Sequence, residues 1–308
     1  MTDARPKVVV GIDGSESAEH ALLWAAQEAT RRGATLVIAH AGDVPDADVL
    51  TDETRHEVAS EVSDYGTALL QDAVDIVQEG FCPVEVNSVL REANPADLLT
   101  ELSAEASLVV VGRSRHNPIE RLLLGSNARR VADRAHCPVV VVSDEVPTTG
   151  GPIVVGVSET DNGRLAMQMA CDEARLRSAE LVAIRSWPDI AWAVSGIGFP
   201  LTTPLAGIEQ AQQRLLDEMV AATRSHYADV RLTPHLSAQP TDIALTSVED
   251  AALLVVGRRR TTAQISRLGP ITSWLIEHAT CPVMVVGGDT AQAEAPELAT
   301  AAVAEVAS

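Results

Sequence analysis

The fold is decided by residues 108–142, which read LVVVGRSRHNPIERLLLGSNARRVADRAHCPVVVV. The run at 108–111 is apolar, rich in valine and too short for a helix, so it predicts a strand buried on both faces. Gly112 ends that strand, and a polar loop broken by Pro118 follows. Gly125-Ser126 then opens a helix whose apolar residues recur at helical spacing. The stretch therefore predicts a strand, a loop and a helix in succession.

The rest of the first half continues this alternation. The helix stops before Cys137-Pro138, because the residue that precedes a proline disfavours the helical backbone. Alternating strands and helices are typical of a parallel sheet with helices on both faces. Strands are predicted at 7–12, 35–41, 84–90, 108–111 and 139–142.

The loop between Gly112 and Ser126 suits an anion. A helix start leaves backbone N–H groups without intrahelical partners, and the helix dipole favours negative charge there. Glycine at 112 and 125 would let the backbone approach a ligand closely, and Ser126 adds a hydroxyl donor. The alternative is that both glycines only make tight turns and that Ser126 only caps the helix.

The chain then repeats itself. Gly11 matches Gly156, 145 positions later, and the same shift carries Pro95 onto Pro240. One constant register over many such points predicts a tandem duplication. The predicted domains are 1–147 and 152–288, followed by a frayed tail at 289–308.

Composition excludes several classes of function. The net charge is −20 and aromatic residues make up 3% of the chain, which argues against nucleic-acid binding. No apolar run is long enough to span a bilayer, so a cytoplasmic protein without a membrane partner is expected. The four cysteines and the histidines lack metal-binding spacing, so no metal site is predicted and the cysteines are expected to be small buried hydrophobes.

Taken together, these motifs resemble the universal stress protein family in its tandem two-domain form. The resemblance extends from Val8 to Val286. It rests on VGIDGS at 10–15, NPA at 94–96, VVVG at 109–112, LGS at 124–126 and HCPVVVV at 136–142. It implies two doubly wound α/β domains, each with a five-stranded parallel sheet in the order 3-2-1-4-5. In the family the last strand of each domain pairs antiparallel across a dimer. Here Val139–Ser143 and Val283–Gly287 could pair in this way within one chain, which would cover two apolar edges. A homodimer is left open.

Resemblance to the ATP-binding members of the family implies an adenine nucleotide site in the first domain. Asp13 would face the adenosine, Gly112 would lie beside the ribose, and the backbone at Ala41 would lie near adenine. Amides at the start of the helix would hold the phosphates of ATP, with any Mg²⁺ carried by those phosphates. The implied cofactor-binding residues are Gly11, Asp13, Ala41, Gly112, Arg115, Gly125, Ser126 and Asn127.

Arg115 departs from the family pattern, which has glycine at that position. An arginine there is disfavoured at positive φ and fills space, so it could plug the pocket. Its guanidinium could instead clamp a phosphate. Arg113 and Arg121 would add to a local cationic patch, which favours an anion.

The second domain is expected not to bind ATP. Ser158 takes the place of Asp13, and Glu159 would bring negative charge near any phosphate. Arg260 occupies the middle glycine position, and Pro270 replaces the phosphate-binding serine and lacks an amide donor.

These observations favour a stress-responsive ATP-binding regulator over an enzyme, since no motif places a catalytic base. The alternative is a nucleotide-free scaffold in which Arg115 closes the pocket. A hydrolase has the least support.

Overall fold

The computed structural model describes residues 5–42, 51–81, 83–113, 126–143, 150–187, 205–258 and 268–287. Several residues discussed above lie outside these ranges: Arg115, Arg121, Gly125, Arg260, Cys82 and the tail at 289–308.

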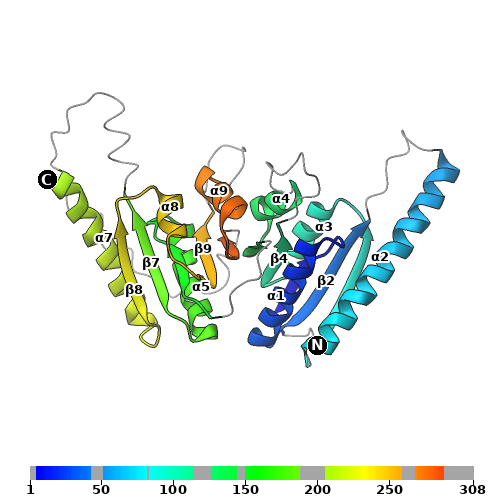
Figure 1. Cartoon of the computed structure of the whole chain (residues 1–308), viewed down its shortest axis with the longest axis horizontal. Helices are drawn as coiled ribbons and strands as arrows, with labels where there is room; N and C mark the ends of the chain where they lie inside the picture. Colours follow the sequence, from blue (N-terminus) through cyan, green and yellow to red (C-terminus); the bar gives the residue numbers. More distant parts are fainter. Residues whose placement is uncertain are drawn as a thin grey trace.

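The described residues fold as two halves with the same succession of elements (Figure 1). The first half contains β1 (Lys7–Gly11), α1 (Glu16–Arg32), β2 (Thr35–Gly42), α2 (Asp52–Gly80), β3 (Val86–Glu92), α3 (Pro95–Leu102), β4 (Leu108–Gly112), α4 (Ser126–Arg134) and β5 (Val139–Val142). The second contains β6 (Ile153–Gly156), α5 (Asp161–Arg177), β7 (Leu181–Ser186), α7 (Leu205–His226), β8 (Leu232–Ser237), α8 (Thr241–Thr246), β9 (Leu253–Gly257), α9 (Pro270–His278) and β10 (Val283–Val286).

The strands form one ten-stranded sheet in the order β3-β2-β1-β4-β5-β10-β9-β6-β7-β8. Within each half all neighbouring strands are parallel, so the predicted doubly wound fold and its 3-2-1-4-5 order are confirmed. The third strand begins at Val86, two residues later than predicted. The reason is that Val84 still belongs to the turn after α2, where its amide donates to the carbonyl of Phe81 at 3.0 Å.

The two halves join through β5 and β10, which pair antiparallel as predicted. Val140 pairs with Met284, and these two residues occupy equivalent positions in the repeats. A local two-fold axis therefore passes between them, and the chain is an internal dimer of its own halves. Any homodimer must use a different surface, because this edge is already paired.

The hydrophobic core follows the faces of the sheet and not the boundary between the halves. One cluster of buried residues lies on the face covered by α1, α2, α5 and α7, and includes both Val140 and Met284. A second cluster lies under α3, α4, α8 and α9 (Figure 1). Since each cluster contains residues from both halves, the sheet and its helices form one packed unit.

Local signals explain where α1 begins and ends. The hydroxyl of Ser15 accepts a hydrogen bond from the amide of Ala18 at 3.2 Å, which caps the first turn. Gly33 ends the helix with φ of 59°, a left-handed conformation that glycine adopts at low cost. The equivalent Ser178 ends α5 with φ of 52°.

Candidate functional site

The candidate site lies at the carboxyl edge of the first half's sheet, where parallel α/β folds bind ligands. β1 pairs with β2 on one side and with β4 on the other. Asp13 follows β1, Ala41 lies near the end of β2, and Gly112 ends β4. The fold thus brings together the first-half strand ends that the sequence assigned to the site.

Asp13 is exposed and organises the turn between β1 and α1. Its Oδ1 accepts hydrogen bonds from the amide of Ser15 at 3.0 Å and from the hydroxyl of Ser15 at 2.5 Å. Gly14 between them has φ of 80°, where a side chain would be strained. One carboxylate oxygen therefore shapes the loop, while the aspartate stays at the surface of the sheet edge.

The structure gives Gly112 an intramolecular role. A Cβ atom at this position would lie 2.3 Å from the carbonyl oxygen of Ser17, so only glycine lets the start of α1 pack against the end of β4. In the second half Gly257 approaches the carbonyl oxygen of Asn162 in the same way, with a Cβ distance of 2.7 Å. Close packing is therefore sufficient to explain both glycines, and a glycine at either position does not by itself indicate a ligand-binding site.

α4 starts at Ser126, and the exposed Asn127 follows in its first turn. The helix is fixed to α3 by Arg130, which donates to Asn94 Oδ1 at 3.2 Å and to Asp97 Oδ1 at 3.2 Å. Asn94 also caps α3 through the amide of Ala96. The NPA motif therefore holds the helix that carries the expected phosphate amides.

His40 and Tyr65 are neighbours of the site that the sequence did not single out as ligand-binding residues. His40 is buried, and its Nδ1 lies 2.8 Å from the carbonyl oxygen of Ile12, which can only accept, so Nδ1 carries the proton. Tyr65 on α2 meets it edge-on at 6.2 Å and is 58% exposed. A Cβ atom at Gly14 would lie 2.6 Å from the hydroxyl of Tyr65, which places that hydroxyl over the turn.

The corresponding edge of the second half is occupied by an ion pair. Arg185, at the position equivalent to His40, donates to Glu159 Oε2 at 3.3 Å and to Gln212 Oε1 at 2.7 Å. The arginine side chain is 11% exposed. Pro270 opens α9 and contributes no amide. Both features act against an anion at this edge.

The expectation that Arg113 belongs to a cationic patch at the site is wrong. Arg113 is 6% exposed and points into the other half, where its Nη1 donates to the carbonyl oxygens of Glu277 and Ala279, both at 2.9 Å. These carbonyls end α9, and a helix C-terminus attracts a cation. Arg113 is therefore an interface residue.

Among the described residues no group of three or more histidine, cysteine or acidic side chains could hold a metal ion. Nor does that part of the chain include a helix with the length and apolarity needed to cross a bilayer. Cys137 and Cys171 are buried, as predicted, and Cys281 is partly buried. Burial raises the pKa of the Cys137 thiol to about 12, so it is a poor nucleophile.

Comparison with known proteins agrees with this geometry. The family model described as "Universal stress protein family" matches residues 5–143 and, a second time, residues 151–287. The chain belongs to the universal stress protein family. The tandem form inferred from the repeat is thus confirmed.

Related universal stress proteins span the same length. Universal stress protein Rv2623 of Mycobacterium tuberculosis is 31% identical over 290 residues, covering 90% of this chain and 95% of its own. Universal stress protein Rv2005c of the same organism is 30% identical over 302 residues, covering 90% and 96%. A solved universal stress protein from Archaeoglobus fulgidus shares the fold, with a TM-score of 0.66 at 15% identity over 91% of this chain and 97% of that one.

Proposed function

We propose that this universal stress protein binds ATP in its first half, at no more than one molecule per chain. The nucleotide shifts the population of the chain between conformations, so the protein acts as a regulator and not as a turnover enzyme. Resemblance to the ATP-binding members of the family assigns the adenosine to Asp13 and Ala41, and the phosphates to the start of α4.

The observation that carries the proposal is the difference between the two carboxyl edges. In the first half an exposed aspartate and the start of α4 lie at this edge, with Ser126 and Asn127 in the first turn. The first amides of a helix have no intrahelical acceptor and favour an anion. In the second half Ser158 takes the place of the aspartate, the Glu159–Arg185 pair lies next to it, and Pro270 takes the place of Ser126.

The sharpest test transfers Pro270 to the equivalent position of the first half, as Ser126→Pro. Proline is well tolerated at the first position of a helix, and α9 already begins with one. The substitution therefore removes an amide donor while keeping the helix. A hydrogen bond to a charged group contributes about 1.5–3 kcal/mol, so ATP affinity should fall roughly 10- to 100-fold. Isothermal titration calorimetry measures this, and the reverse substitution Pro270→Ser should create no second site.

A second pair of variants tests the aspartate. Asp13→Ala should abolish ATP binding, whereas Ser158→Ala removes the matching turn contact in the second half and should leave binding unchanged. Native mass spectrometry of the unaltered chain should find a single nucleotide. A chain whose melting temperature does not change with millimolar ATP would refute the proposal, because a bound ligand stabilises by mass action. That result would favour the nucleotide-free scaffold closed by Arg115.

A further inference from the structure

α4 is held at its C-terminal end by the other half of the chain. Arg258 follows β9 and reaches across the interface, where its Nη1 lies 2.8 Å from the carbonyl oxygen of Asp133. The same nitrogen lies 3.3 Å from the carbonyl oxygens of Ala132 and Ala135. The guanidinium of Arg258, a residue of the second half, therefore donates hydrogen bonds to three carbonyl oxygens at the C-terminal end of α4.

A second contact joins the same turn of α4 to the second half. The amide of Leu268, just before α9, donates to Asp133 Oδ1 at 3.0 Å. Arg258 is itself fixed, because Asn162 of α5 donates a hydrogen bond to its carbonyl oxygen. The end of α4 is thus bound to Arg258 and Leu268, and Arg258 is itself held by α5.

These contacts matter because α4 is short. It has nine residues, and helices of that length depend on tertiary contacts in water. The carbonyls of its last turn lack intrahelical partners, and a cation beside them complements the helix dipole. Arg258 is 4% exposed, so solvent hardly screens this interaction.

The contact has a counterpart at the equivalent position of the other repeat. Arg113 holds the end of α9 as Arg258 holds the end of α4. The two helices differ at their beginnings, since α9 starts with Pro270 and α4 with Ser126. Each half anchors a helix of its partner, but only the anchor on α4 supports a helix that begins at the candidate site.

We propose that Arg258 is a positioning residue for the nucleotide site of the first half, and that the second half is kept because it completes that site from behind. The inference rests on the proposed function. Arg258 touches no ligand; it fixes the position and dipole of α4, whose opposite end receives the phosphates of an adenosine polyphosphate. Phosphate at one end and guanidinium at the other stabilise the same helix, so their effects are coupled.

The test compares ATP affinity in three variants of the full chain. Arg258→Met removes the charge and the hydrogen bonds, and should weaken ATP binding about tenfold, within the usual range of coupling between sites. Arg258→Lys keeps the positive charge but loses the guanidinium's hydrogen bonds to the three carbonyls, and should weaken ATP binding less than Arg258→Met does. Met284→Ala removes buried volume where β5 pairs with β10, in the hydrophobic cluster on the face of the sheet opposite α4, and should lower the melting temperature without changing ATP affinity. Wild-type affinity in Arg258→Met, or an equal loss in Met284→Ala, would overturn the proposal.

Hydrogen exchange without nucleotide separates this inference from the proposed function. In Arg258→Met the amides of α4 should exchange at least several times faster than in the parent chain, while those of α9 keep their rates. If the parent chain binds no ATP, the proposed function fails, and exchange still decides whether Arg258 fixes the position of α4. Unchanged exchange in α4, or equal acceleration in α4 and α9, would then overturn it.

Discussion

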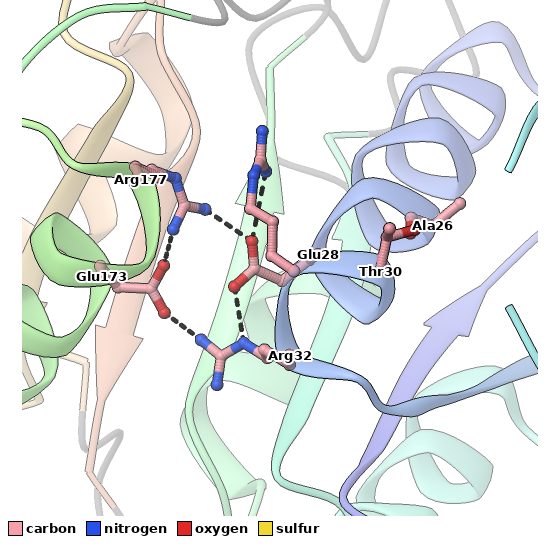
Figure 2. A network of polar contacts seen from close by, with 7 residues as sticks. Ala26, Glu28, Thr30, Arg32, Glu173 and Arg177 are labelled. Carbon is pink, nitrogen blue, oxygen red and sulfur yellow. Dashed lines mark hydrogen bonds and ion pairs between the residues drawn. The ribbon is translucent and has the colours of Figure 1, made fainter. Parts of the chain in front are cut away.

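Arg177 on α5 donates a 2.7 Å hydrogen bond to Glu28 on α1, a carboxylate with 0% exposure that lies 149 positions earlier in the chain. Arg32 binds Glu28 at 2.6 Å and also reaches Glu173 on α5, and Arg177 completes the ring by binding Glu173 (Figure 2). Two carboxylates and two guanidinium groups thus alternate at the interface of the halves. We call these four residues the buried quartet.

The quartet has the same local two-fold symmetry as the antiparallel pairing of β5 with β10. Glu28 and Arg32 are equivalent to Glu173 and Arg177 in the repeat, and each arginine contacts the glutamate of its own helix and that of the other. Buried ion pairs contribute little net stability, but in some proteins they select one arrangement of the packed elements. We infer that the quartet sets how α1 and α5 meet across the sheet.

Glu28→Gln should destabilise the chain by about 3–5 kcal/mol, because removing one partner leaves buried arginine charge uncompensated. Urea unfolding should show a lower midpoint at an unchanged slope. Glu85→Gln is the control, since Glu85 pairs with Arg5 at the surface, where the side chains are 45% and 60% exposed. Such pairs contribute at most about 1 kcal/mol. Equal stability losses in the two variants would contradict a special role for the quartet.

The two glutamates of the quartet should respond to pH in opposite directions. Burial raises the pKa of Glu28, but the charges of Arg177, Arg32 and Arg31 outweigh it, so that pKa lies below its usual value of 4.5. Burial raises the pKa of Glu173, the charge of Glu28 adds to this, and the pKa stays above 4.5. The difference arises within the pair, because a charge on Glu28 disfavours a second charge on Glu173, while Arg31 adds a positive charge beside Glu28.

The signs follow from linkage. Because the pKa of Glu28 is lower in the folded chain than in the unfolded chain, Glu28 stabilises the folded state above pH 4.5. This contribution is lost as pH falls through the folded pKa. Because the pKa of Glu173 is higher in the folded chain than in the unfolded chain, Glu173 stabilises the folded state below pH 4.5. This contribution is lost as pH rises through the folded pKa. Compared with Glu173→Gln, the parent should therefore lose stability as pH rises above 4.5. Urea midpoints from pH 4 to 8 measure this, and a parallel course for both chains would contradict it.

Much of the fold could be predicted because the signals are local and repeated. Short apolar runs such as 108–111 and 139–142 predict buried strands, and Gly33 indicates the end of a helix. Matching residues recur 145 positions apart in the sequence, which predicts that the two halves have the same fold. The pairing of β5 with β10 is what the resemblance to the family suggests, and it covers two apolar edges.

Side-chain direction was harder to predict. Arg113 lies next to Gly112 in the sequence, which predicts a place in the cationic patch, but its side chain crosses to the other half. The quartet was missed, yet a signal existed. Glu28 follows Ala25 by three positions on the apolar stripe of α1, and the repeat places Glu173 identically on α5. Charged residues on a buried stripe, repeated in both halves, indicate pairing across the interface.

The thiols of Cys137 and Cys171 should resist alkylation in the folded chain. Burial raises the pKa of each to about 12, and for Cys171 the charge of Asp172 adds to the effect. The thiolate is the reactive form, so the reactive fraction at pH 8 is roughly 10⁻⁴. Peptide mapping after treatment with N-ethylmaleimide should find both residues unmodified in the native chain and modified in guanidinium chloride. Modification within minutes under native conditions would show that the cores open readily.

The two halves should unfold together in a single transition, because each hydrophobic cluster contains residues of both. Val109 on β4 and Leu254 on β9 occupy equivalent positions and are buried in the same cluster. Val109→Ala and Leu254→Ala should each cost about 1–5 kcal/mol and shift the whole transition to lower temperature. Calorimetry should record one endotherm in which the calorimetric and van't Hoff enthalpies agree. Two endotherms, with each variant shifting only the one from its own half, would mean that the pairing of β5 with β10 and the buried quartet do not couple the halves.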